Sequence, residues 1–192
     1  MSIVGNVLKA IGNTPLVELR RVVPTGHARV LVKLEGTNPT GSMKDRMAIA
    51  VIERAESDGR LRPGGTVVEY TGGSTGTSLA LVCAAKAYKI RIVTSDAFSQ
   101  EKRNHMRALG ADLVEVPSQA GGITKELIEE MIELAHRMSE EPGAYYSDQL
   151  LNTDAIAGYH PLGEEIWSQT GGRVDAFVQV VGTAHAIEGT AE

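Results

Sequence analysis

Several features that would assign a protein to a particular class are absent or rare in this sequence. It has one cysteine in 192 residues, so no disulfide can form within the chain. It has no apolar run long enough to span a membrane, and its first residues lack the basic and apolar regions of a secretory signal. The formal net charge is −5 without any basic block, so nothing indicates binding to nucleic acid or to an anionic membrane. We therefore expect a cytoplasmic protein.

The sequence also lacks the residue spacing of a metal site. Its five histidines show no paired spacing with one another or with Cys83, so we predict no bound metal. Cys83 lies among apolar residues of an expected helix, which favours a small buried side chain over a nucleophile. The hydrophobic fraction of 42% and the charged fraction of 22% are typical of a globular protein, with one large domain or two small ones.

Short apolar runs alternate with longer amphipathic stretches along most of the chain. The runs predict strands, and the stretches with apolar residues at helical spacing predict helices. We expect strands over 16–19, 29–34, 66–70, 90–94, 111–116 and 174–181, and helices over 43–57, 77–88, 99–109, 123–139 and 163–168. Strands separated by helices in this way indicate βαβ units, an α/β fold and a mostly parallel sheet.

One polar loop places a lysine at the start of an expected helix. Pro39 and Gly41 mark the loop, and Ser42 precedes Asp45 by the spacing of a capping box. Lys44 then falls in the first helical turn, where the positive end of the helix dipole opposes a cation. This position favours the free amine, which a lysine needs to form a Schiff base. On local residues alone, a capped helix with a solvated lysine is the better explanation.

Two glycine-containing turns change that balance. The turn Thr71–Gly76 follows the expected strand 66–70 and precedes a helix, and the turn Gly182–Ala186 follows the expected strand 174–181. A glycine-rich turn between a strand and a helix lets backbone amides approach an anion at the helix N-terminus. The sequence therefore predicts two anion sites.

The first turn has a second interpretation. Thr71-x-Gly73-x-x-Gly76 after a strand, with Asp96 twenty residues further on, looks like a dinucleotide-binding fingerprint. The glycine that normally makes the tight turn is replaced by Thr71. This alternative explains neither Lys44 nor the second turn.

Together with the Ile-Gly-Asn-Thr-Pro-Leu stretch at 11–16, the loop and the two turns resemble a known family in their order and spacing. This is the cysteine synthase / cystathionine β-synthase family of pyridoxal-phosphate enzymes, which has the tryptophan synthase β-like fold (fold type II). The resemblance runs from about residue 11 to 182. It implies two parallel-sheet αβα domains: a smaller, mobile one over 40–145, and a larger, incomplete one made of 1–39 with 146–192.

The resemblance also implies residue roles. Lys44 would carry pyridoxal 5′-phosphate and act in catalysis, and Ser74 would approach the cofactor's 3′-oxygen. The cofactor phosphate would bind the second turn, at Gly182, Thr183, Ala184, His185 and Ala186. The carboxylate of an amino-acid substrate would bind Thr71, Gly72, Gly73, Thr75 and Gln149.

The sequence departs from the family pattern in both turns. Ser74 stands where the family usually has an asparagine, and has a shorter reach. Ala184, His185 and Ala186 replace Gly-Gly-Thr, so the backbone loses φ freedom and the site loses a hydroxyl group. The imidazole of His185 could instead add a cationic partner for phosphate.

The function that the resemblance implies is β-replacement by a cysteine synthase, which converts O-acetylserine and sulfide to cysteine and acetate, in a homodimer. The alternatives are a cystathionine β-synthase or a serine/threonine dehydratase-like lyase, and a non-catalytic protein that binds the cofactor or an amino acid. Because family members continue well beyond residue 192, we expect this chain alone to bind the cofactor weakly and to turn over slowly.

Overall fold

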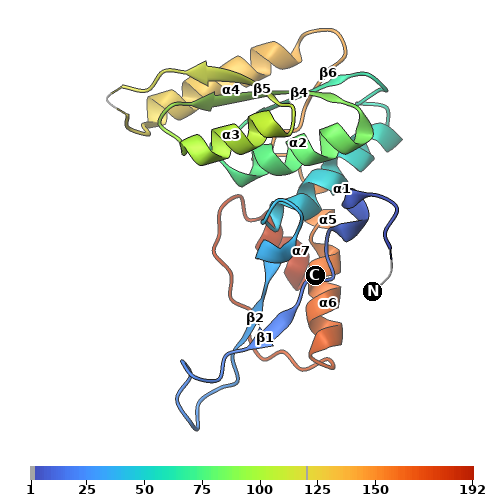
Figure 1. The fold of residues 1–192 in the computed structure, drawn as a ribbon, viewed down its shortest axis with the longest axis vertical. Coiled ribbons are helices and arrows are strands. Elements are labelled where there is room, and N and C mark those ends of the chain that lie inside the picture. Colours follow the sequence, from blue (N-terminus) through green and yellow to red (C-terminus); the bar gives the residue numbers. More distant parts are fainter. Residues whose placement is uncertain (1–2, 120) are drawn as a thin grey trace.

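The computed structural model describes residues 3–119 and 121–192 and contains a parallel sheet covered by helices on both faces (Figure 1). The four strands run in the order β5-β4-β3-β6. Their bounds are β3 Thr66–Tyr70, β4 Lys89–Ser95, β5 Asp112–Val116 and β6 Ala144–Tyr146. The α/β fold and the parallel sheet expected from the sequence are confirmed.

The two faces of the sheet bury alternate residues of the same strands. Val67 of β3 packs with helices α1 (Lys44–Ser57), α2 (Ser74–Lys86) and α3 (Gln100–Ala108). Val68, the next residue, packs on the opposite face with α4 (Lys125–Ser139). β3 is thus buried from both sides, which explains its nearly continuous apolar sequence.

A smaller group of elements lies at the other end of the molecule (Figure 1). Strands β1 (Leu16–Glu18) and β2 (Leu31–Lys33) pair antiparallel, with Val17 opposite Val32. Around them lie the 3-10 helices η1 (Val7–Ala10) and η2 (Glu35–Thr37) and the helices α5 (Asp154–Ala157), α6 (His160–Gln169) and α7 (His185–Ala191). Among the described residues, no helix is long and apolar enough to cross a membrane.

Most expected elements lie within a few residues of their predicted bounds, but two predictions need correction. Helix α2 begins at Ser74 rather than at 77, so part of the first glycine turn is already helical. The strand expected over 174–181 was wrong: these residues have no strand structure, and Val178 and Val180 are 90% and 92% exposed. A strand exists only by pairing, and no strand of the described part of the chain pairs with this segment.

A buried ion cluster joins α1 to the smaller group of elements. The Arg46 guanidinium, 3% exposed, donates to both carboxylate oxygens of Glu35 at 2.7 and 2.9 Å. It also donates to both oxygens of Glu165 on α6, at 2.8 Å each. Lys33 of β2 adds a bond of 2.6 Å to Glu165. The cluster therefore holds the N-terminal turn of α1, which contains Lys44, against η2 and α6.

Candidate active site

Lys44 is the first residue of α1, as expected, but the turn before it is capped differently. The Asp45 carboxylate accepts hydrogen bonds from the Thr40 amide at 2.8 Å and the Thr40 hydroxyl at 2.5 Å. The Asp45 amide donates to the Ser42 carbonyl at 3.3 Å, but the Ser42 hydroxyl does not bond to Asp45; its Oγ accepts from the Lys44 amide at 3.2 Å. The predicted Ser42–Asp45 capping box was therefore wrong. The residue before the helix is Met43 rather than Ser42, and Met43 already has helical φ and ψ.

This turn is also attached to the helix that follows the first glycine turn. The Thr40 hydroxyl lies 3.2 Å from the Ser78 hydroxyl of α2. Lys44 itself is half-buried, and burial lowers the pKa of its amine below the ordinary value. A lowered pKa increases the fraction of free amine, which is the nucleophilic form of lysine.

The first glycine turn and Gln149 lie at the switch point of the sheet. From β3 the chain moves to β4 and β5 on one side and then returns to β6 on the other, so the loops after β3 and β6 diverge. In open parallel sheets, ligands bind in the crevice outside the carboxyl ends of such strands. The Thr75 hydroxyl donates to Gln149 Oε1 at 2.7 Å, and Gln149 Nε2 donates to the Tyr70 carbonyl at 2.8 Å. The structure therefore brings together two residues expected to share one ligand.

The glycine turn itself is tightly packed. The Thr71 amide donates to the Val93 carbonyl at 2.9 Å, and the Gly73 amide donates to Thr71 Oγ1 at 3.1 Å. A side chain at Gly72 would overlap the Phe98 ring, so the backbone passes where only glycine fits. Ser74 and Thr75 open α2, and the first N–H groups of a helix have no partner within it. Those amides are the donors that an anion would meet.

The second turn runs from Gly182 through Thr183 to Ala184, after which His185 opens α7. Ala184 has φ +67° and ψ −26°, a left-handed conformation that costs a residue with a side chain about 1–2 kcal/mol. The replacement of glycine by Ala184 is therefore a strained one.

His185 is 6% exposed, and its Nδ1 has no hydrogen-bond partner among residues 3–119 and 121–192. Burial lowers the pKa of its imidazole, and the charge of Lys44 lowers it further, whereas the charges of Glu188 and Asp148 raise it. The side chains of Lys44 and His185 are thus electrostatic neighbours, and Asp148 links them to Gln149, the next residue along the chain. The lysine loop, the second turn and the segment after β6 therefore lie near enough for their charges to act on His185.

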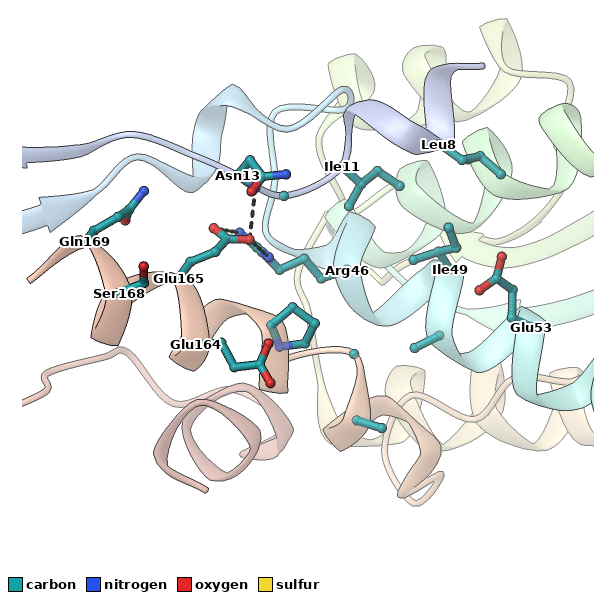
Figure 2. A pocket seen from close by; sticks show the side chains of 15 residues that line it. Leu8, Ile11, Asn13, Arg46, Ile49, Glu53, Glu164, Glu165, Ser168 and Gln169 are labelled. Atoms are coloured by element: carbon teal, nitrogen blue, oxygen red, sulfur yellow. Dashed lines mark hydrogen bonds and ion pairs between the residues drawn. The ribbon is translucent and has the colours of Figure 1, made fainter. Parts of the chain in front are cut away.

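A separate cavity lies away from these residues (Figure 2). It has a volume of about 580 Å³ and lies between η1, α1 and α6. None of the sequence-predicted site residues lines it. Its main charged groups, Arg46 and Glu165, are bonded to each other. We therefore take the Lys44 site, rather than this cavity, as the candidate active site.

Comparison with known proteins identifies the family. Residues 7–192 match the family model described as "Pyridoxal-phosphate dependent enzyme". The chain belongs to this family. The recognition made from the loop and the two turns is thereby confirmed.

Cysteine synthase relatives and solved structures are similar over most of this chain. It is 43% identical to cysteine synthase B of Salmonella typhimurium over 182 residues, which are 94% of this chain and 58% of the relative. It is 43% identical to cysteine synthase of Staphylococcus aureus over 189 residues, or 97% and 59%. The cysteine synthase of Entamoeba histolytica has a TM-score of 0.89 and 36% identity, covering 99% of this chain and 56% of that one. An O-ureido-L-serine synthase has the same TM-score and identity, with 98% and 58% covered. The chain thus spans a little under three-fifths of its relatives' length.

The residues present fit a pyridoxal phosphate group. Lys44 offers a partly buried amine, His185 an unpartnered buried imidazole nitrogen, and the start of α2 free backbone donors. An aldehyde that carries a phosphate needs an amine and an anion site side by side. Ser74, Gly182, Thr183 and Ala186 lie in the same turns, but within residues 3–119 and 121–192 no side-chain hydrogen bond of theirs assigns them a role.

Sequence reasoning missed Glu69. This residue is 0% exposed and bonds to the segment that carries Gln149. A signal was available, because Glu69 is the single charged residue in the apolar run Thr66–Tyr70. Charged residues are rarely buried unless they have partners.

Proposed function

We propose that this chain binds pyridoxal 5′-phosphate on Lys44 and acts as a cysteine synthase. The observation that supports the proposal is the buried His185 Nδ1, which has no hydrogen-bond partner in the described part of the chain and senses the charge of Lys44. The hydrogen bond between Thr75 and Gln149 supports it further. His185 would hold the phosphate, with donors from Gly182, Thr183, Ala184 and Ala186. Ser74 would lie beside the cofactor ring.

The substrate carboxylate would bind the first turn, at Thr71, Gly72, Gly73 and Thr75, together with Gln149. The hydrogen bond between Thr75 and Gln149 supports this part, since both groups face one another at the carboxyl ends of β3 and β6. When bound, the cofactor supplies an electron sink for carbon acids. The Lys44 amine would take the proton from the substrate's α-carbon, a role for which its lowered pKa suits it.

The reaction we propose converts O-acetylserine and sulfide to cysteine and acetate. Support comes from the cysteine synthase relatives and from the solved cysteine synthase with the same fold. From the family resemblance we also propose a cytoplasmic homodimer in which residues 40–145 move as a small domain against the remainder.

A pair of matched variants tests the substrate site. Thr75→Val removes the hydroxyl that donates to Gln149 at little change in shape. Thr77→Val is the control, because the buried Thr77 hydroxyl on the same helix has no hydrogen-bond partner among the described residues. With pyridoxal phosphate bound, we expect Thr75→Val to weaken the spectral response to O-acetylserine about tenfold and Thr77→Val to leave it unchanged, since one lost hydrogen bond costs about 1–1.5 kcal/mol.

Product analysis then decides the reaction. Cysteine formed from O-acetylserine and sulfide supports the synthase, whereas a 2-oxo acid and ammonia formed from serine or threonine would indicate the dehydratase. Saturable binding of NAD that Thr75→Val destroys, with no response to any amino acid, would contradict the proposal and favour the dinucleotide interpretation.

A further inference from the structure

The buried carboxyl group of Glu69 accepts two hydrogen bonds from the segment after β6 and one from its own strand. Its Oε2 accepts from the Ser147 hydroxyl at 2.8 Å and from the Gln149 amide at 3.0 Å. Its Oε1 accepts from the amide of Tyr70 at 3.0 Å. The side chain is fully buried in a strand covered on both faces, so these bonds form without competition from water.

The segment that Glu69 holds is a sharp bend. The Ser147 amide donates to the Val68 carbonyl at 3.0 Å, and the pairing of β6 with β3 ends there. Asp148 then has φ +48°, in the left-handed region that non-glycine residues rarely adopt. A strained residue persists only where its neighbours hold it in place. Glu69 bonds to both neighbours of Asp148, namely Ser147 and Gln149.

The bend determines where the Gln149 side chain lies. Beyond the bend, the Gln149 amide group reaches the Thr75 hydroxyl of α2 and the Tyr70 carbonyl of β3. Three points thus hold Gln149: its main chain on Glu69, its side-chain oxygen on Thr75 and its side-chain nitrogen on Tyr70. Without the main-chain contact, the other two would have to restrain the bend alone.

We propose that Glu69 is a positioning residue of the amino-acid site: its carboxyl group holds the Ser147–Gln149 bend and keeps the Gln149 amide at the first glycine turn. The identity of the ligand rests on the proposed function, whereas the positioning of Gln149 does not. Because Glu69 is fully buried, it would act on the ligand through Gln149 rather than by direct contact.

Burial also affects the charge of Glu69. Burial raises the pKa of its carboxyl group to about 8, although the bonds from Ser147 and Gln149 oppose the rise and the charge of Asp148 adds to it. The other titratable groups that sense Glu69 are the hydroxyls of Tyr70 and Tyr146. The ionised form accepts all three hydrogen bonds. The raised pKa nevertheless means that the buried site as a whole favours the protonated form, because the cost of burial exceeds the gain from these bonds.

Glu69→Gln tests the inference, with Glu115→Gln as the matched control. Glutamine keeps the shape but has one acceptor oxygen and no charge, so it cannot accept both from Tyr70 and from the bend, and the bonds that it keeps are no longer charge-assisted. Glu115 lies on β5 and bonds instead to Arg103 at 2.6 Å. Without cofactor, we expect Glu69→Gln to speed hydrogen exchange of the Gln149 amide about tenfold. Glu115→Gln should leave it unchanged.

With pyridoxal phosphate bound, Glu69→Gln should weaken O-acetylserine binding about tenfold and leave the amount of cofactor fixed by borohydride unchanged. If the variant does not fold, Ser147→Ala, which removes one of the bonds to Glu69, should give a smaller effect of the same kind. Unchanged exchange at Gln149 in whichever variant folds would overturn the inference. Equal losses of cofactor and amino-acid binding would also overturn it, since they indicate a merely structural role. Failure of wild-type protein to bind the cofactor would contradict the proposed function alone, because exchange at Gln149 still decides the positioning.

Discussion

Replacing Arg46 by leucine should sharply destabilise the protein. The guanidinium makes two two-pronged contacts, one with Glu35 and one with Glu165, at distances from 2.7 to 2.9 Å. Burial alone would raise the pKa of each carboxyl group. Hydrogen bonds, those from Arg46 foremost, instead lower the pKa of Glu35 and bring that of Glu165 to about 2. Both carboxylates are therefore ionised in the folded protein.

The expected magnitude follows from what Arg46→Leu leaves behind. Removing one partner of a buried ion pair costs about 3–5 kcal/mol, because the remaining charge stays buried. Glu165 keeps Lys33 at 2.6 Å, and Glu35 keeps the Thr14 hydroxyl at 2.6 Å, so we expect the lower half of this range. For a chain of this length, 1 kcal/mol shifts the melting temperature by about 2–4 °C. The variant should melt about 6–15 °C below wild type.

Thermal unfolding followed by circular dichroism measures this effect, and Arg54→Leu is the control. Arg54 lies on the same helix, but its side chain is 63% exposed and its ion pairs are 3.7 and 4.0 Å long. Exposed pairs contribute about 0–1 kcal/mol, so the control should lose at most a few degrees. Equal shifts for the two variants at pH 7 would refute the assigned role of the cluster.

The pH dependence provides an independent check. Because the folded pKa of Glu165 lies below its ordinary value of 4.5, its contribution to stability is present above pH 4.5 and is lost as pH falls toward 2. The difference in stability between wild type and Arg46→Leu should therefore shrink over this interval. A difference that stays constant down to pH 2 would show that packing, rather than charge, causes the loss.

Two further predictions concern the turns. Gly72→Ala should destabilise the protein by about 1–3 kcal/mol, because its methyl group would overlap the Phe98 ring, whereas Gly73→Ala meets no atom within 4 Å and should cost far less in a denaturant titration. Ala184→Gly and Ala87→Gly should each raise stability by about 0.5–1 kcal/mol, since both alanines have positive φ. Only Ala184→Gly should also change the affinity for pyridoxal phosphate, measured by absorbance titration; equal effects of the two on affinity would contradict a role for Ala184 in the phosphate site.

Local sequence patterns were sufficient to predict the parallel sheet and the position of Lys44. The apolar run at β3 and the helical spacing along α4 each act within one element, and their packing follows from their own side chains. The expected strand over 174–181 failed because a strand also depends on a neighbour, and apolar content alone does not provide one.

Contacts between distant residues were outside the reach of the sequence. Arg46 and Glu165 are 119 positions apart, and Glu69 and Gln149 are 80 apart, so no spacing rule joins them. The capping partner of Asp45 was missed for a different reason. Both Thr40 and Ser42 have hydroxyl groups, and the choice between them depends on the helical φ and ψ of Met43. The meeting of Thr75 and Gln149 was expected only from the family resemblance, and the sheet order now gives it a physical cause.

The most direct test of the central claim is to locate the covalent link to the cofactor. The chain is mixed with pyridoxal 5′-phosphate, reduced with borohydride and digested, and the labelled peptide is identified by mass spectrometry. Lys44→Ala and Lys89→Ala are treated in parallel, Lys89 being exposed at the start of β4. The account predicts label on Lys44 in wild type and in Lys89→Ala, and its loss in Lys44→Ala. Label on other lysines, undiminished in Lys44→Ala, would contradict it.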